Sequence, residues 1–454
     1  MQTGKERTLF VDDGDIAQKK ALRKIVHQGE KCPENPLLIG EMPWEANLIC
    51  GGTVRKESDG YRMWYQSYDK GTYINLYAES PDGLNWHRPD LGQLPDYDGK
   101  VQNNIFLSRL GLRSEQRAPV AVNQDHNPNV LYTPHFGADK QYTLISYDYA
   151  RSGYAPYDGY VLAYSRDGIV WTDGPENPVI PGYADVGMFT FDPVAGMFRG
   201  IVKNFLEIRG YRRRSVLATE SPDASNWTFP QPAFLPDVED DAWAETYNTS
   251  EKKMAHTQVY GMPIFRYESM LIGFPQIFRI TDTENPSHDG PVDIQLTSSR
   301  DGRTWDRVGN RETIVPTGEP GTYDAGGVYT GNSLIVEDDE VRIYYTGCTT
   351  THALPGETGV CMVSWQRDRF VGLSADPSGG TVELKPRKAG KTLHVNADAS
   401  RGAINLTIPD TDVQERLVGD KLDHAVNIPR HLIGKKVVVR LELKDSEVFS
   451  IWWD

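Results

Sequence analysis

Hydrophobic residues along this chain recur at the spacing of β-strands. Residues 292–296 alternate apolar and polar side chains, and residues 160–164 are apolar throughout. Both patterns are typical of strands with one or both faces buried. Similar runs fill most of the sequence after residue 30, between turns rich in glycine and aspartate. Residues 15–27 differ, because their apolar positions have helical spacing and predict one amphipathic helix.

One short motif, Ser-x-Asp-small-x-x-Trp, occurs four times. The copies begin at Ser80, Ser165, Ser221 and Ser299. Asp-Gly pairs form tight turns, because glycine accepts a positive φ and aspartate can bond to its own backbone. A strand-like run precedes the first, second and fourth copies. The motif is therefore interpreted as the outer turn of a β-propeller blade, with tryptophan as its anchor. Four unrelated hairpins are the alternative.

The repeats divide the chain into units. The first four end at Trp86, Trp171, Trp227 and Trp305, and a fifth ends in a degenerate turn at residues 366–370. Five units predict an all-β fold with a five-bladed β-propeller over residues 31–375. The strands after residue 376 lack the motif and predict a C-terminal β-sandwich over residues 376–454. Residues 1–30 are expected to form a separate N-terminal segment containing the helix.

Composition narrows the classes of function. The chain has 454 residues, 39% of them hydrophobic, and a net charge of −15, which argues against a nucleic-acid partner. No apolar run is long enough for a membrane span. The four cysteines include no Cys-x-x-Cys pair, so we expect no zinc site and no cofactor. The N-terminus lacks an apolar signal core, which fits either a cytoplasmic protein or one whose signal was removed.

Candidate catalytic residues are carboxylates that precede inner strands, because these positions converge on the central funnel of a propeller. The candidates are Glu45, Asp185, Glu245 and Asp324. Two carboxyl groups facing each other suit glycoside cleavage, one as acid and one as base or nucleophile. Each has a structural alternative. Glu45 and Glu245 fit solvated loops, whereas Asp185 and Asp324 fit turn caps.

Candidate substrate-binding residues are aromatic, acidic and imidazole side chains near the same positions. They are Trp44, Trp64, Asp125, His126, His256 and His352. Indole rings stack on sugar faces, and imidazoles bind hydroxyl groups. A structural role is the alternative for both types. The expected partner is a carbohydrate, and the sequence leaves open whether the chain forms a homo-oligomer.

Three short segments resemble the five-bladed glycoside hydrolases of families 32 and 43. Residues 61–66 resemble the family-32 strand that ends in aromatic-Tyr-Gln, and residues 324–329 resemble its Asp-x-Gly-x-x-Tyr segment. Asp185 resembles the blade-three aspartate. The resemblance implies an exo-acting hydrolase of a furanoside or another terminal sugar. The family-32 segments Asn-Asp-Pro-Asn-Gly and Glu-Cys-Pro are absent, and Glu45 occupies the place comparable to the first.

Two other functions fit the same fold. A phosphorylase resembling family 130 would need basic residues in the funnel to hold phosphate. Arg209, Arg212, Arg213 and Arg214 are available for this. A carbohydrate-binding propeller without catalysis is the other alternative.

Overall fold

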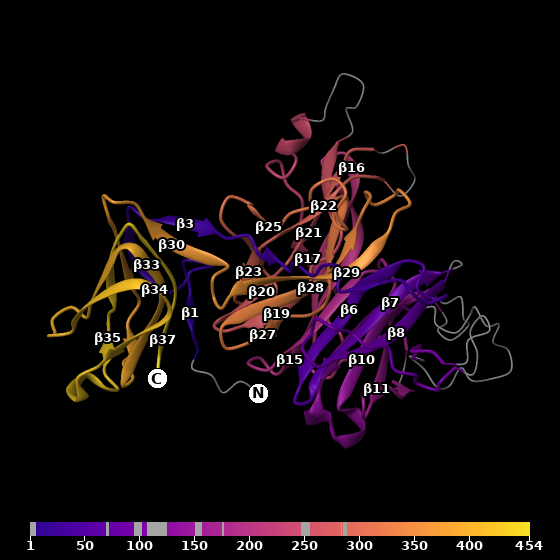
Figure 1. The fold of residues 1–454 in the computed structure, drawn as a ribbon, viewed down its shortest axis with the longest axis horizontal. Helices are drawn as coiled ribbons and strands as arrows, with labels where there is room; N and C mark the ends of the chain where they lie inside the picture. Colours follow the sequence, from indigo (N-terminus) through magenta and orange to yellow (C-terminus); the bar gives the residue numbers. More distant parts are fainter. Residues whose placement is uncertain are drawn as a thin grey trace.

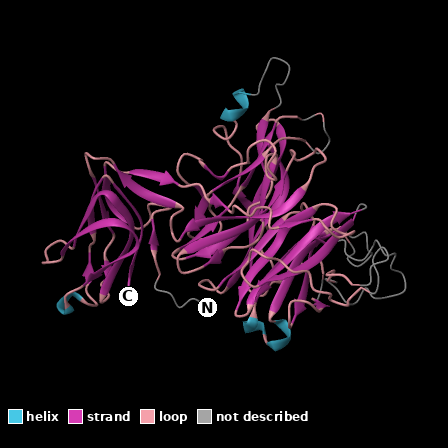
Figure 2. Cartoon of the chain, viewed as in Figure 1, coloured by secondary structure: helices cyan, strands magenta, loops and turns pink. Residues whose placement is uncertain are grey.

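The structure is a computed structural model. It describes residues 6–69, 72–94, 102–106, 125–149, 157–174, 177–246, 255–282, 284 and 288–454. Nearly all regular structure is β-strand, with a few short 3-10 turns (Figure 2). Within these ranges, no helix combines the length and the apolar character that crossing a membrane requires. The all-β class is as predicted.

Five blades form the larger body of the molecule (Figure 1). Blade 1 contains β6 (Leu48–Glu57), β7 (Gly60–Asp69) and β8 (Thr72–Ser80). Blade 2 contains β9 (Asp125–Tyr132), β10 (Tyr142–Asp148), β11 (Gly159–Ser165), β12 (Trp171–Asp173) and β13 (Ile180–Pro181). Blade 3 contains β14 (Gly187–Asp192), β15 (Met197–Ile208), β16 (Tyr211–Ser221) and β17 (Gln231–Phe234).

Blade 4 has interrupted strands. Its first strand comprises β18 (His256–Val259) and β19 (Ile264–Tyr267), its second β20 (Met270–Gly273) and β21 (Gln276–Ile280), and its third β22 (Val292–Gln295) and β23 (Thr297–Ser299). The edge strands are β24 (Asp306–Arg307) and β25 (Thr313–Val315). Pro263 and Pro275 lie at two of the interruptions, where a proline cannot donate a ladder hydrogen bond.

Blade 5 is completed by the N-terminal part of the chain. It contains β26 (Gly327–Thr330), β27 (Ile335–Val336), β28 (Glu340–Cys348) and β29 (Thr358–Gln366). The short strands β4 (Glu30–Lys31) and β5 (Leu38–Ile39) pair with β29 and supply its outer edge. Neighbouring blades contact each other in chain order: β6 contacts β9, β9 contacts β14, β14 contacts β19 of blade 4, and β22 of blade 4 contacts β26. β26 also contacts β6 of blade 1. The five blades therefore form a closed ring.

The repeated motif forms the turn between the third and fourth strands of a blade. In the second copy, the Ser165 hydroxyl accepts hydrogen bonds from the backbone of Asp167 and Gly168, and the Asp167 carboxylate accepts two more from the following residues. Gly168 has φ +80°, and its carbonyl accepts a 2.6 Å hydrogen bond from the Trp64 indole of blade 1. The Gly83 carbonyl of the first copy likewise accepts from the Tyr344 hydroxyl of blade 5 at 2.9 Å. The predicted turns therefore also join neighbouring blades.

The C-terminal sandwich is one continuous sheet folded into two layers. Its strands are β30 (Val371–Ala375), β31 (Gly380–Leu384), β33 (Thr392–Thr407), β34 (Gln414–Asn427), β36 (Arg440–Lys444) and β37 (Ser446–Trp453). The first half of β33 pairs with β37 and the second half with β36, so this long strand connects the layers. A separate apolar core that includes Val395, Leu406 and Leu441 fills the space between them.

The predicted helix over residues 15–27 is wrong. The N-terminal segment forms β1 (Thr8–Leu9), β2 (Ile16–Lys20) and β3 (Arg23–Val26), which pair with β37, β31 and β30 of the sandwich. Ala21, which directly follows β2, has φ +54°. The chain bends there, and the pairing of β2 with β31 ends. An isolated helix of this length is marginal in water. The open edges of the sandwich offer ladder partners instead, and this tertiary pairing overrides the helical spacing.

Candidate functional site

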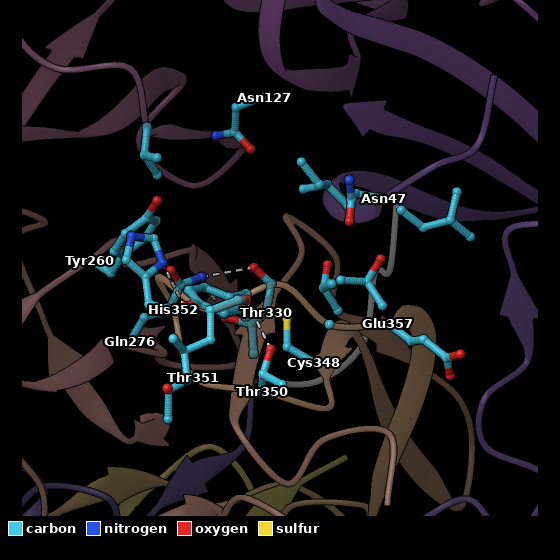
Figure 3. A pocket seen from close by; sticks show the side chains of 18 of the residues that line it. Asn47, Asn127, Tyr260, Gln276, Thr330, Cys348, Thr350, Thr351, His352 and Glu357 are labelled. Atoms are coloured by element: carbon cyan, nitrogen blue, oxygen red, sulfur yellow. Dashed lines mark hydrogen bonds between the residues drawn. The ribbon is translucent and has the colours of Figure 1, made fainter. Parts of the chain in front are cut away.

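A cavity of about 260 Å³ lies where the blades converge. Its wall contains the aromatic rings of Tyr73, Tyr260 and Tyr329, the amides of Asn47, Asn127 and Gln276, the hydroxyl groups of Thr330, Thr350 and Thr351, and the imidazoles of His126 and His352 (Figure 3). These residues come from blades 1, 2, 4 and 5, and Met188 of β14 adds a lining residue from blade 3. Among the described lining residues the only formal charge belongs to Glu357, which is exposed at the rim.

A loop between β28 and β29 supplies one side of the cavity. Asp289 of blade 4 anchors this loop, since its carboxylate accepts hydrogen bonds from the Thr351 hydroxyl at 2.8 Å and the Ala353 backbone at 2.9 Å. The backbone of His352 donates to Gly290 at 3.3 Å. These contacts fix His352 between blades 4 and 5, with its Nδ1 atom 3.1 Å from the Tyr329 hydroxyl.

Asp185 lies next to this cavity, directly before the lining residue Val186. Its carboxylate is 2.7 Å from the Lys203 ammonium and accepts a 2.5 Å hydrogen bond from the Tyr149 hydroxyl. Burial opposes ionisation, but the Lys203 charge, the nearby His126 and the two hydrogen bonds outweigh it and hold the pKa of Asp185 well below its usual range. The side chain still has 30% of its surface exposed. It is therefore an anionic carboxylate within reach of solvent.

The two imidazoles of the cavity are uncharged near neutral pH. Burial lowers the pKa of His126 to about 4, despite the opposing charge of Asp185. Burial also lowers the pKa of His352 to about 4, with Arg214 and Lys203 adding to the effect. His126 stacks on Tyr73 with a centroid distance of 4.1 Å, and Tyr73 is parallel to Tyr149. The imidazoles therefore act as neutral hydrogen-bonding groups at the cavity wall.

Glu45 and Asp324 lie outside the cavity lining. The Glu45 side chain is fully buried; its carboxylate accepts hydrogen bonds from Arg88 at 2.9 Å, from the Tyr65 hydroxyl at 2.7 Å and from two backbone N–H groups. Asp324 has 8% of its side chain exposed and is 2.6 Å from the Lys31 ammonium. The structure therefore places both carboxylates in internal ion pairs and brings neither of them together with Asp185.

The two tryptophans also have internal positions. The Trp44 indole donates a 2.9 Å hydrogen bond to Asn104 within the core of blade 1, and Trp64 joins blade 1 to the turn of blade 2. Asp125 is buried at the start of β9, where its carboxylate accepts a 3.3 Å hydrogen bond from Ser146. His126 and His352, by contrast, line the cavity, and their role in substrate binding stays a prediction.

His256 and Glu245 lie on blade 4 and on the segment that precedes it. His256 is buried, stacks on Tyr211 and is 3.0 Å from the Gln258 amide nitrogen, outside the cavity lining. Glu245 lies in the 3-10 turn η4 (Ala242–Thr246), and its side chain falls outside the described part of the structure.

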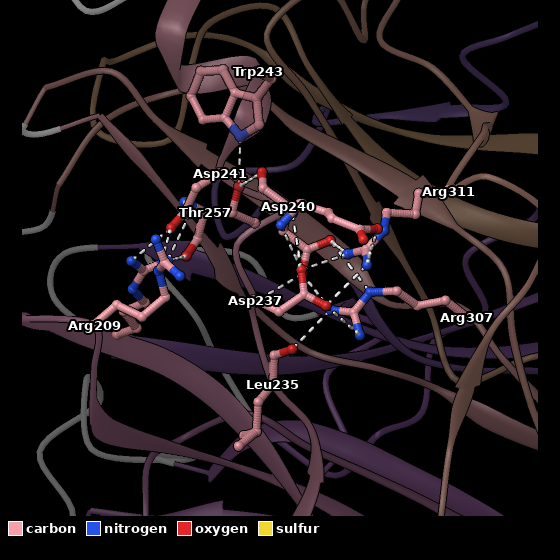
Figure 4. Close-up of polar contacts among 11 residues, drawn as sticks. Arg209, Leu235, Asp237, Asp240, Asp241, Trp243, Thr257, Arg307 and Arg311 are labelled. Carbon is pink, nitrogen blue, oxygen red and sulfur yellow. Dashed lines mark hydrogen bonds and ion pairs between the residues drawn. The ribbon is translucent and has the colours of Figure 1, made fainter.

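The acidic segment before this turn forms an ion-pair network (Figure 4). Asp240 pairs with Arg307 and Arg311, and Asp237 pairs with Arg311 at 2.8 Å. Asp241 accepts two hydrogen bonds from the buried Arg213 guanidinium, at 2.8 and 2.9 Å. This acidic segment is therefore held to blades 3 and 4 by ion pairs.

Sequence reasoning missed several residues of the site. Tyr73, Tyr149, Lys203, Tyr260 and Gln276 lie at or next to the cavity. One signal was present, because Lys203 directly follows the apolar pair Ile201 and Val202 in a strand-like run, and a buried lysine needs an anionic partner. The other four are ordinary strand or loop residues, and only the tertiary structure shows which way they face.

The described residues contain no cluster of three or more His, Cys, Asp or Glu side chains able to hold a metal ion. The chemical groups of the site are therefore the carboxyl groups of Asp185 and Glu357, an ammonium paired with Asp185, neutral imidazoles, amides, hydroxyl groups and aromatic rings.

No model of a known protein family matches the chain, and no curated protein matches it. Similar solved structures include an N-acetylgalactosamine deacetylase from F. plautii in complex with blood group B trisaccharide, with a TM-score of 0.46 and 13% identity over 77% of this chain and 97% of that one. An α-L-arabinofuranosidase from Podospora anserina in complex with cellotriose has a TM-score of 0.46 and 10% identity, covering 75% of this chain and 96% of that one.

A glycosyl hydrolase from Bacteroides ovatus is also similar, with a TM-score of 0.47 and 14% identity over 74% of this chain and 94% of that one. Several of the solved structures that resemble this chain are thus glycoside hydrolases. Likeness at this level does not determine the reaction of this chain, which has to be derived from its own residues.

Proposed function

We propose that the protein is a glycoside hydrolase that binds a terminal, uncharged sugar ring in the central cavity. The observation that carries this proposal is the combination of Asp185, ionised and accessible, with a small cavity of aromatic, amide and hydroxyl groups. Its volume of about 260 Å³ lies slightly below the ~300–1,000 Å³ of typical ligand pockets, which favours a ligand of one or two rings. A small pocket of this kind favours exo action on a furanoside or another terminal sugar.

Asp185 is proposed as the base, nucleophile or charge stabiliser of the reaction. Each of these roles needs an ionised carboxylate, and the low pKa of Asp185 supplies one throughout the neutral and mildly acidic range. Lys203 and Tyr149 are positioning residues, because they hold the carboxylate in one orientation.

Glu357 is proposed as the second carboxyl group. It lies at the rim of the cavity, where a leaving group would depart from a ring bound deeper inside. Figure 3 shows it on the side of the cavity opposite Tyr260 and His352. A protonated carboxyl group at this position would donate to the glycosidic oxygen as the bond breaks.

Hydrolysis is favoured over phosphorolysis by the cations of the site. Lys203 is paired with Asp185, and Arg213 is saturated by Asp241 and two backbone carbonyls. The described residues that line the cavity include no lysine or arginine. A phosphate co-substrate would need such a group.

The proposal is tested by measuring sugar release from aryl furanosides, aryl pyranosides and a panel of plant, algal and bacterial glycans. Wild-type protein, Asp185→Asn and Glu357→Gln are compared, with and without inorganic phosphate. We expect phosphate-independent release by the wild type, and a loss of roughly a hundredfold or more in each variant. Release that both variants retain would reject these assignments. Binding of a sugar without any release would favour the non-catalytic propeller.

A further inference from the structure

The amide side chains of the cavity share one property, which is that their N–H groups face carbonyl oxygens of the protein. From this we propose that the cavity is a cage of hydrogen-bond acceptors that selects an uncharged ring with free hydroxyl groups. The inference takes the sugar site from the proposed function and concerns its specificity in binding. It follows from the donors and acceptors of six residues, taken in turn.

Gln276 shows the principle most clearly. Its Nε2 atom donates to the Thr330 carbonyl at 3.0 Å and lies 3.3 Å from the Thr330 hydroxyl (Figure 3). A carbonyl oxygen can only accept, so the amide nitrogen, and not the oxygen, must face it. The Oε1 atom is then left without a hydrogen-bond partner among the described residues. It is available to a ligand as an acceptor.

Asn127 is fixed in the same way from blade 3. Its Nδ2 atom donates to the Gly187 carbonyl at 2.5 Å, which determines the orientation of the amide. The backbone of Asn127 has φ +59°, which is uncommon for residues other than glycine. Two neighbouring blades therefore hold it in place, and within the described part of the chain its Oδ1 atom has no donor.

Asn47 and two threonines add further acceptors. The Asn47 Nδ2 atom donates to the Tyr68 carbonyl at 3.3 Å, which leaves Oδ1 for the cavity. The Thr350 hydroxyl donates to the Leu354 carbonyl at 3.0 Å, and the Thr351 hydroxyl donates to Asp289 at 2.8 Å. Each hydroxyl hydrogen is thus already used, and the oxygen lone pairs remain.

His126 is an acceptor because of Gln66. The Gln66 Nε2 atom donates to the Asp125 carbonyl at 2.6 Å, and its Oε1 atom accepts from the Asn127 backbone at 2.7 Å. The His126 Nδ1 atom lies 3.2 Å from the same Oε1. Facing an acceptor, Nδ1 must carry the proton of the neutral imidazole. Nε2 is therefore the unprotonated nitrogen, and Gln66 is the positioning residue that selects this tautomer.

These acceptors need a ligand that donates. Ring hydroxyl groups do so, and the rings of Tyr73 and Tyr260 add apolar surface to the lining. A carboxylate or phosphate would meet lone pairs at each of these six side chains. A divalent cation prefers carboxylate ligands, and none of these acceptor atoms belongs to a carboxylate. An O-methylated sugar keeps the ring but loses the donors and gains methyl groups, so the site should reject it.

The tautomer of His126 can be measured without any ligand. In ¹⁵N NMR of the full chain at neutral pH, with the signal assigned by His126→Asn, we expect the Nδ1-protonated form of His126. Gln66→Met should produce a mixture of tautomers while the signal of His394 in the sandwich stays unchanged. An Nε2-protonated His126 in the wild type would overturn the assignment of this acceptor.

The specificity is tested by calorimetric titration with methyl α-L-arabinofuranoside, methyl β-D-xylopyranoside, methyl β-D-galactopyranoside and methyl α-D-mannopyranoside. Their fully O-methylated forms, methyl β-D-glucuronide and calcium chloride are titrated in parallel. We expect at least one free glycoside to bind, and its O-methylated form to bind at least about tenfold more weakly. The glucuronide and calcium should show no comparable binding. Equal binding of the free and O-methylated forms, preferred binding of the glucuronide or calcium, or no binding of any free glycoside would overturn the inference.

A matched pair of variants locates the effect. Asn127→Gly keeps the positive φ without strain and removes the acceptor, so we expect about a tenfold loss of affinity for the bound glycoside. Asn332→Ala is the control, because Asn332 also donates its amide to a β14 carbonyl, that of Phe189, but is not a lining residue. The affinity of the Asn332→Ala variant for the glycoside should equal that of the wild type. Equal losses in both variants would contradict a direct contact.

Binding and turnover separate this inference from the proposed function. If the free glycosides bind selectively but no sugar is released, the acceptor cage stands and the hydrolase proposal fails. If O-methylated and free substrates are hydrolysed equally well, the hydrolase proposal stands and the acceptor cage fails.

Discussion

The charge on Asp185 depends most on one neighbouring residue, Lys203. The Lys203 ammonium is 2.7 Å from the carboxylate, and burial alone would raise the pKa of Asp185. Similar pairings explain why Glu45 and Asp324 are internal, since Arg88 and Lys31 neutralise them. All three carboxylates are thus paired with a cation, and Asp185 differs in having 30% of its side chain exposed.

We predict that Lys203→Met raises the pKa of Asp185. The low folded-state pKa keeps the wild-type carboxylate ionised, so activity should persist as the pH falls toward about 4. Without Lys203, burial favours the protonated form, and the acidic limb of kcat/KM should move to higher pH. The measurement is the pH–rate profile, with the exposed Lys140→Met as the control. An unchanged acidic limb in Lys203→Met would show that Asp185 is not the titrating group.

The buried imidazole of His126 should make stability depend on pH. Its pKa is about 4 in the folded protein against 6.5 for the ordinary group, so the unfolded chain binds the extra proton between these values. Stability should therefore fall as the pH drops from about 6.5 toward 4, by about 1.4 kcal/mol per unit for this group. Chemical denaturation at several pH values measures this slope. The His126→Asn variant should have a shallower one, and an equal slope in both proteins would contradict a buried neutral His126.

At the scale of elements, the second copy of the repeated turn depends on its glycine for two reasons, although the third copy has Ala224 with φ +63° at the same place. Gly168 has φ +80°, and a Cβ atom there would lie 2.7 Å from the Trp64 ring. Gly210 also has φ +80°, but a Cβ atom there would meet nothing within 4 Å. The two positions therefore share the backbone strain and differ in the interblade contact.

We predict that Gly168→Ala destabilises the protein by about 2 kcal/mol more than Gly210→Ala, because only the first displaces Trp64. The free energy of unfolding from denaturant titration measures the difference. Equal costs would mean that the turn does not join the blades tightly.

The acidic segment before blade 4 should be held by its buried member. Asp240 has 3% of its side chain exposed and pairs with two arginines, so Asp240→Asn should cost about 3–5 kcal/mol. Glu239 has 74% exposed, and Glu239→Gln should cost less than about 1 kcal/mol. Denaturant titration tests both. Similar small effects would show that the network in Figure 4 adds little to stability.

Much of the element-level structure follows from the sequence. The strand runs and the serine–aspartate turns were predictable because their signals are local. The helix over residues 15–27 was predicted wrongly, because its true partners, β30 and β31, are more than three hundred residues away in sequence. The same applies to the site. Position before an inner strand identified Asp185, but the direction in which Glu45 points depends on Arg88, which belongs to another segment.

At the scale of the molecule, the N-terminal segment belongs to both bodies. Its first strands pair with the sandwich, and the next two complete blade 5. Asp368 lies at this junction with no exposed side-chain surface, 2.6 Å from the Arg7 guanidinium and hydrogen-bonded to Tyr267 and Ser450. The expected domain boundaries at residues 30 and 375 remain a prediction. Strands from the N-terminal segment pair with both the sandwich and blade 5.

We predict that Asp368→Asn destabilises both bodies together by about 3–5 kcal/mol, because it breaks a buried charge network. Asp420→Asn, at a pair whose carboxylate is 46% exposed, should cost less than about 1 kcal/mol. Calorimetric unfolding should show one shifted transition in the first variant. Two separate transitions, with only one shifted, would show that the bodies unfold independently.

The central claim is that an ionised Asp185 at the sugar cavity performs glycoside hydrolysis. Its most direct test is chromatographic measurement of sugar released from the glycoside and glycan panel by the wild type and by Asp185→Asn. The account predicts release by the wild type and a loss of roughly a hundredfold or more in the variant, which should remain folded. Equal release by both proteins, or no release of sugar from any member of the panel, would contradict it.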